Sequence, residues 1–82
     1  MRYTVTWIPS ARNELADIWV NATDKRAVTA AANEIDRLLG SDAHLQGEEF
    51  GEVRILEEWP LVVTFRVSPD DRLAEVTDVR HL

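Results

Sequence analysis

The sequence contains no cysteine and only two histidines, His44 and His81. Without cysteine there is no disulfide framework and no thiolate ligand for a metal. Two isolated histidines do not provide the ligand spacing of a zinc site. The sequence therefore predicts a fold held together by packing alone, with no metal and no cofactor.

Long apolar runs are also missing. None approaches the roughly 20 residues that a membrane-spanning helix requires. Residues 1–5 alternate like a strand and do not form the apolar core of a signal peptide. We therefore expect a cytoplasmic protein that does not associate with membranes.

The 82 residues suffice for one domain with a modest core, so we expect a single domain over residues 1–82.

Positive charge is scarce. The formal net charge is −6 and the sequence pI is about 4.7, whereas a nucleic-acid-binding protein usually carries a basic surplus. Lys25 is the only lysine, and all other basic residues are arginines. Because the guanidinium group suits bidentate contacts to phosphate or carboxylate, the positions of the arginines are more informative than their number.

Hydrophobic periodicity predicts six elements. A strand is expected over residues 3–8, and Pro9 begins a first helix that runs to Ala22. Thr23 and Asp24 form the next break and provide the N-cap of a second helix, which ends at Gly40. A polar loop is expected over 41–51, and strands follow at 52–57, 61–67 and 73–80. This order, β-α-α-β-β-β, predicts an α+β fold in which a helical hairpin packs on a mainly antiparallel four-stranded sheet.

Residue parity assigns side chains to the faces of this sheet. A tight hairpin centred near Pro60 would place Arg54 close to Arg66 on the face away from the helices. Because neighbouring like charges destabilise a sheet, such a pair predicts an anion, or a partner's carboxylate, between the two guanidinium groups. The alternative is that each arginine pairs with a nearby glutamate.

The last strand has a mixed pattern. Ala74 and Val76 indicate one buried face, whereas Leu73 and Val79 indicate the other. A β-bulge near Thr77 and Asp78 would reconcile them. Of the aromatic residues, Trp7, Trp19 and Phe65 are predicted to be core residues, and Trp59 is predicted to be an exposed contact or a packing lid.

Several short motifs follow one another in a distinctive order. They are Val5–Ala11 followed by Leu15–Trp19, then Val53–Leu56, Pro60–Val67 and Val76–Leu82. In this order they resemble the RelE/ParE superfamily of bacterial toxins, in which a first strand leads into a helix of the form A-x-x-x-L-x-x-I and R-x-L, (Y/F)-R-V and V-x-H signatures follow. The resemblance covers essentially the whole chain.

The resemblance implies the toxin of a type II toxin–antitoxin, or plasmid-stabilisation, system. Such a toxin is neutralised by an antitoxin protein that wraps its C-terminal segment over it. RelE-like members are endoribonucleases that inhibit translation by cutting mRNA on the ribosome. Their RNA 2′-hydroxyl attacks the adjacent phosphate, a reaction that needs a base, cations and an acid. ParE-like members share the fold but poison DNA gyrase and need no such catalytic set.

The resemblance also implies site residues. Arg66 matches the family's arginine after the aromatic residue, so its role would be to bind phosphate and stabilise the phosphorane; the alternative is a structural ion pair. His81 is the candidate acid, because histidine titrates near neutral pH, unless it is simply a frayed surface residue. Arg54 completes the predicted catalytic set by positioning phosphate.

Two further residues are candidates for substrate binding. Arg80 would contact phosphate if the bulge turns it outward. Glu49, or its neighbour Glu48, could hold the substrate or serve as the base; the alternative is a solvated loop carboxylate. His44 lies in the same loop and is expected to be exposed to solvent.

Three hypotheses follow. The first is a RelE-type endoribonuclease that uses Arg66, Arg54 and His81. The second is a ParE-like protein that inhibits gyrase by binding. The third is a degenerate toxin that retains only the antitoxin interaction. RelE-type RNases tend to be basic and lysine-bearing, so the charge of −6 weighs against strong RNA binding unless the arginines form a local patch.

Overall fold

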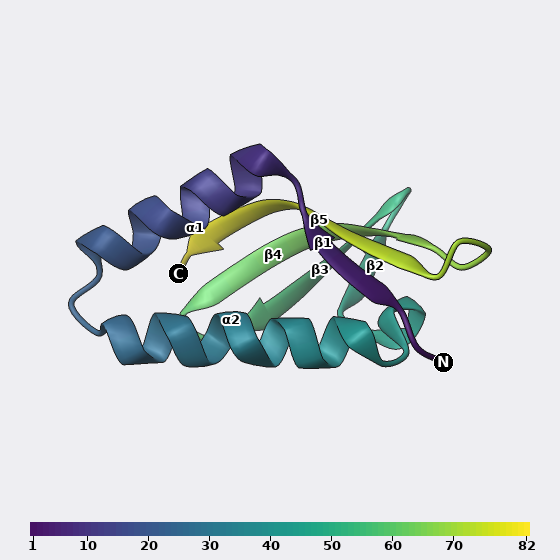
Figure 1. The fold of residues 1–82 in the computed structure, drawn as a ribbon, viewed down its shortest axis with the longest axis horizontal. Coiled ribbons are helices and arrows are strands. Elements are labelled where there is room, and N and C mark those ends of the chain that lie inside the picture. Colours follow the sequence, from purple (N-terminus) through teal and green to yellow (C-terminus); the bar gives the residue numbers. More distant parts are fainter.

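A computed structural model describes all residues from 1 to 82. Two helices and one five-stranded sheet follow the chain in the order β1, α1, α2, β2, β3, β4, β5, with a short 3-10 turn, η1, before β2 (Figure 1). The helices are α1 (Pro9–Asn21) and α2 (Lys25–Gly40), and η1 covers Ala43–Leu45. The strands are β1 (Thr4–Trp7), β2 (Glu48–Phe50), β3 (Val53–Glu58), β4 (Leu61–Ser68) and β5 (Leu73–His81).

The strands lie in the order β1-β5-β4-β3-β2. β1 runs parallel to β5, and the other neighbours are antiparallel. The predicted α+β architecture is therefore confirmed, with one correction. The sheet has five strands and not four, because part of the predicted loop over 41–51 forms β2, which pairs with β3 as a hairpin.

Local sequence signals define the helix ends. Pro9 occupies the first turn of α1, where its missing N–H costs no hydrogen bond. The Asp24 carboxylate accepts a hydrogen bond from the Ala27 N–H at 3.0 Å and caps α2, as predicted. The ammonium group of Lys25 donates to the Val20 and Ala22 carbonyl oxygens at the end of α1, and so holds the turn between the helices. Neither helix is long and apolar enough to cross a membrane.

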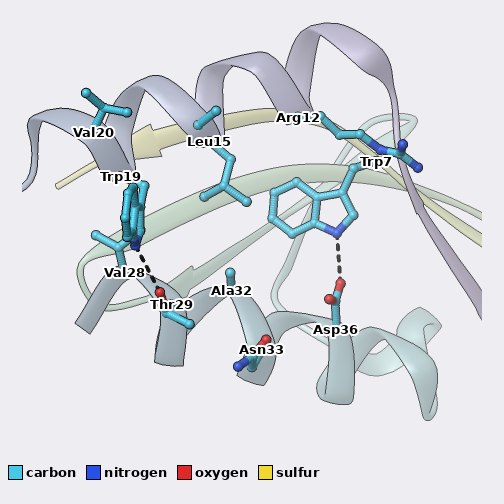
Figure 2. Close-up of a pocket in the computed structure, with 11 residues that line it drawn as sticks. Trp7, Arg12, Leu15, Trp19, Val20, Val28, Thr29, Ala32, Asn33 and Asp36 are labelled. Atoms are coloured by element: carbon cyan, nitrogen blue, oxygen red, sulfur yellow. Dashed lines mark hydrogen bonds between the residues drawn. The ribbon is translucent and has the colours of Figure 1, made fainter. Parts of the chain in front are cut away.

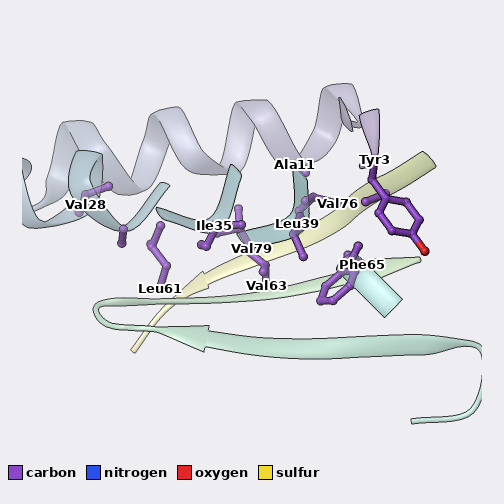
Figure 3. Packing of buried hydrophobic residues seen from close by; sticks show 13 residues of the cluster. Tyr3, Ala11, Val28, Ile35, Leu39, Leu61, Val63, Phe65, Val76 and Val79 are labelled. Carbon is purple, nitrogen blue, oxygen red and sulfur yellow. The ribbon is translucent and has the colours of Figure 1, made fainter. Parts of the chain in front are cut away.

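A single hydrophobic core lies between the helices and one face of the sheet (Figure 3). Alternate residues of β4 are buried, with Phe65 fully inaccessible to solvent. α2 contributes residues at helical spacing, including Ile35 and Leu39, which are also fully buried. Both helices pack on this face. The opposite face of the sheet, which we call the outer face, contains no buried residue.

A β-bulge in β5 is confirmed. Thr64 of β4 is the register partner of Asp78, and the next residue, Phe65, is the partner of Val76. Thr77 is therefore the extra residue, and the shift brings Val79 to the same buried face as Ala74 and Val76.

The segment between α2 and β2 differs from the prediction. His44 is half-buried and not fully exposed, because its ring packs against Tyr3 at a centroid distance of 5.8 Å. The Tyr3 hydroxyl and His44 Nδ1 share a hydrogen bond of 2.9 Å. Tyr3 is buried, and this part-buried bond gives its hydroxyl a partner within the protein.

Two carboxyl groups have perturbed pKa values, Glu34 in the C-terminal half of α2 and Asp42 just after the helix. A hydrogen bond from the Arg37 guanidinium lowers the pKa of Glu34, and a hydrogen bond from the terminal ammonium of Met1 lowers that of Asp42. A lowered pKa in the folded state stabilises the fold above the ordinary carboxyl range, and this contribution is lost as the pH falls through that range.

Candidate functional site

The predicted site residues lie on different faces of the sheet. Arg66 projects from β4 on the outer face, where Glu75 of β5 is its register partner. It is exposed and takes part in no ion pair. Arg66 is therefore free to contact a ligand.

Arg54 lies on the other face, so the predicted Arg54–Arg66 pair is wrong. Two residues, Trp59 and Pro60, connect β3 and β4, and Glu58 is the partner of Leu61. This register makes Arg54 the partner of Phe65, a core residue, instead of Arg66. A shift of one residue moves every side chain to the opposite face.

Arg54 has a structural role at the β2–β3 hairpin. Its Nε donates to the Gln46 carbonyl oxygen at 2.7 Å, and its Nη2 donates to the Gly47 carbonyl oxygen at 3.3 Å. Its Nη1 lies 3.4 Å from Oε2 of Glu49, a residue predicted to bind substrate, so Arg54 pairs with a nearby glutamate as the alternative interpretation has it. The side chain is only 17% exposed, so most of its donors are committed within the protein.

Replacing Arg54 with alanine is expected to destabilise the protein by about 1–3 kcal/mol, because two carbonyl oxygens lose a charged donor. Urea denaturation measures the change. Arg66→Ala is the matched control, and we expect it to change stability by less than about 0.5 kcal/mol because Arg66 is exposed. Equal losses in the two variants would contradict the structural role of Arg54.

His81 is also remote from Arg66. It is the register partner of Leu61, the first residue of β4. Leu61 and Arg66 are about 17 Å apart along the strand, and they lie on opposite faces. His81 instead lines a hollow beside α1 together with Glu14 and Asp17, two carboxylates that would repel a phosphate.

Arg80 is on the same outer face as Arg66, opposite Val62. It is exposed, the condition on which a phosphate contact depends, and it forms no ion pair. The two arginines are separated by about 13 Å along the sheet. The structure therefore brings Arg66 and Arg80 to one face and joins Arg54 to Glu49, but it does not assemble Arg66, Arg54 and His81 around one point.

A second candidate surface was not predicted from the sequence. A crevice of about 490 Å³ runs between α1 and α2, and we call it the helix groove (Figure 2). Trp7 and Trp19 stand along it, and each indole N–H donates to α2, to Asp36 at 2.8 Å and to Thr29 at 3.1 Å. Trp19 is 42% exposed, so its prediction as a core residue is wrong.

Basic side chains border the helix groove. Arg12 lines one end, and Lys25 and Arg26 lie in the adjoining hollow beside Trp19. The Lys25 ammonium lies 5.3 Å from the centre of the Trp19 ring, within the range of a cation–π interaction. Asp36 is the only acidic residue among those lining these two cavities. The groove is thus apolar and locally cationic on a protein whose net charge is −6.

Sequence comparison assigns the chain to no family, because no protein-family model and no curated protein matches it. Solved structures do match. A chain of the toxin–antitoxin complex RelBE2 from Mycobacterium tuberculosis has a TM-score of 0.78 at 14% identity, covering 100% of this chain and 93% of that one. A chain of the chromosomal ParDE system from P. aeruginosa has a TM-score of 0.72 at 21% identity, covering 99% and 97%.

A chain of the RelE–RelB complex from the archaeon Pyrococcus horikoshii OT3 has a TM-score of 0.69 at 13% identity, covering 99% of this chain and 96% of that one. The similarity extends over the full length of the fold in all three comparisons. The chain therefore has the RelE/ParE-like fold that the resemblance of its motifs implies.

Proposed function

We propose that this chain is the toxin of a toxin–antitoxin pair and that it inhibits growth by binding its target without cleaving RNA. The RelE/ParE-like fold, seen in structures solved as toxin–antitoxin complexes, supports the toxin role. One observation favours binding over cleavage. The candidate acid, His81, and the candidate phosphate ligand, Arg66, are on opposite faces and about 17 Å apart along the sheet, so they do not reach one phosphate.

The partner in this proposal is a cognate antitoxin. The helix groove supports it, because an amphipathic segment could bury apolar side chains against Trp7, Trp19 and Leu15. Acidic residues beside those apolar side chains would complement Arg12 and Arg26. The proposed target is a protein such as DNA gyrase.

A second candidate, the RelE-like mRNA endoribonuclease, has one observation in its favour. Arg66 and Arg80 are exposed, unpaired and on the same open face, where an extended RNA backbone could reach both. This version requires an acid other than His81. The acidic side chains on the same face, Glu75 and Asp78, oppose it because they offset both arginines.

Induced expression of the chain in bacteria is expected to arrest growth, and co-expression of a small neighbouring open reading frame is expected to restore it. His81→Ala should arrest growth as strongly as the wild type, because His81 takes no part in binding the target. Colony counts after induction measure both effects. Loss of toxicity in a folded His81→Ala variant would favour histidine catalysis, and absence of toxicity in the wild type would favour a degenerate toxin.

A further inference from the structure

A shallow cavity of about 480 Å³ lies on the outer face at the β2–β3 end of the sheet, and we call it the outer hollow. Its lining residues are Gly47, Glu48, Phe50, Ile55 and Glu57. Glu48 is the register partner of Ile55, so the two side chains are on one face. The outer hollow therefore belongs to the open side of the sheet, on the opposite side from the helix groove.

The floor of the outer hollow is apolar. Phe50 is 53% exposed, although it belongs to a strand and has no polar group to solvate. Its register partner, Val53, is half-buried, as are Ile55 and Val62 on the same face. Apolar side chains gathered on an open face characterise a surface that binds a partner. A nucleic-acid backbone would gain little from such a floor, because its affinity depends on cations.

The rim of the outer hollow is acidic and unneutralised. Glu48 and Glu57 are exposed and take part in no ion pair. Arg66 of β4 and Arg80 of β5 are on the same face, but neither forms an ion pair with Glu48 or Glu57. The guanidinium of Arg54 is held on the other face by the Gln46 and Gly47 carbonyl oxygens. Two uncompensated carboxylates repel phosphate and attract a cationic side chain.

We infer that the outer hollow binds a protein segment that presents an arginine or lysine beside an apolar side chain. The cation would lie between Glu48 and Glu57, and its aliphatic stem and apolar neighbour would cover Phe50 and Ile55. This inference rests on the proposed function, because it defines the chemistry of the target that the toxin binds. It assigns the outer hollow to a basic protein segment, and not to RNA.

The test uses the full chain and three fluorescent probes of equal length. These are a peptide with alternating leucine and arginine, the same peptide with glutamate in place of arginine, and a single-stranded RNA. Fluorescence anisotropy is expected to show that the arginine peptide binds at least about tenfold more tightly than the other two. Comparable affinity for the RNA or for the glutamate peptide would overturn the inference.

Substitutions test whether the arginine peptide binds at the outer hollow. Glu57→Lys and Phe50→Ala are each expected to weaken binding of the arginine peptide by about tenfold or more. Glu14→Lys makes the same charge change on the exposed surface of α1, away from the outer hollow, and is expected to leave the affinity within about twofold of the wild type. An equal loss in Glu14→Lys would show a non-specific attraction to net charge and would overturn the inference. All variants are first checked for folding by thermal denaturation.

Growth assays separate this inference from the proposed function. If the wild type arrests growth, Glu57→Lys and Phe50→Ala are expected to lose toxicity, whereas Glu14→Lys is expected to keep it. Full toxicity of the two outer-hollow variants would overturn the inference and leave the toxin role intact. If the wild type does not arrest growth, the proposed function fails, and the peptide measurements still decide whether the outer hollow selects a basic segment.

Discussion

Replacing Phe65 with alanine is expected to destabilise the protein by about 3–5 kcal/mol, the usual cost of removing a buried aromatic ring. Phe65 is fully buried at the centre of the only core. A domain of this size has a small free energy of unfolding, so the substitution would remove most of it. The midpoint of thermal unfolding should fall by roughly 12 °C or more.

Phe50→Ala is the matched control, because it makes the same chemical change on the outer face. Phe50 is 53% exposed, and its removal should cost about 0.5 kcal/mol or less. Circular dichroism followed during heating compares the two variants. If Phe50→Ala destabilised the protein as much as Phe65→Ala, the outer face would be part of a core and could not be an open binding surface.

Gly47→Ala is expected to destabilise the protein by about 2–4 kcal/mol, through backbone strain and overlap together. Gly47 has a φ of 67°, which side chains other than glycine rarely adopt. A Cβ at this position would also overlap the Ile55 carbonyl group of β3. The variant should lose the β2–β3 hairpin and the Arg54 contacts that depend on it. Urea denaturation gives the free energy, and hydrogen exchange at the β2 amides shows whether the hairpin has opened.

Gly51→Ala separates strain from overlap. Gly51 has a similar φ of 61°, but nothing lies within 4 Å of a Cβ built there. Its replacement should cost about 1 kcal/mol, from the left-handed backbone alone. Similar losses at Gly47 and Gly51 would mean that close approach to β3 does not matter at Gly47.

Much of this fold follows from the hydrophobic periodicity of the sequence and from the residues that start and cap its helices. The Asp24 cap and Pro9 define the starts of the two helices. Conflicting parity between Val76 and Val79 indicates a bulge near Thr77 and Asp78, and the structure places it at Thr77, where it brings both valines to one buried face. These features are local, so a single sequence contains the information that determines them.

β2 is not predictable in the same way. Its residues, Glu48, Glu49 and Phe50, are all exposed, so no alternation of apolar and polar side chains marks the strand. Its formation depends on pairing with β3 and on the backbone freedom of Gly47 and Gly51 at its two ends. In the sequence, the only sign of this strand is the pair of glycines that bracket it.

The site residues depend on register, which the sequence leaves open. The prediction that Arg54 and Arg66 share a face assumed a hairpin one residue longer than the observed connection through Trp59 and Pro60. Helical spacing assigns Trp19 to the core, but its ring stands at the edge of the helix groove, hydrogen-bonded to Thr29 of α2 and 42% exposed. Spacing along one helix does not determine how far away the next helix packs.

The central proposal is that this chain is a toxin that acts by binding its target and not by cutting RNA. The most direct measurement is to sequence RNA ends bearing 2′,3′-cyclic phosphates before and after induction of the wild type, with Arg66→Ala and His81→Ala alongside. We predict that growth stops while such ends do not increase. New cyclic-phosphate ends in the wild type that disappear in Arg66→Ala would contradict the proposal, whether or not they persist in His81→Ala.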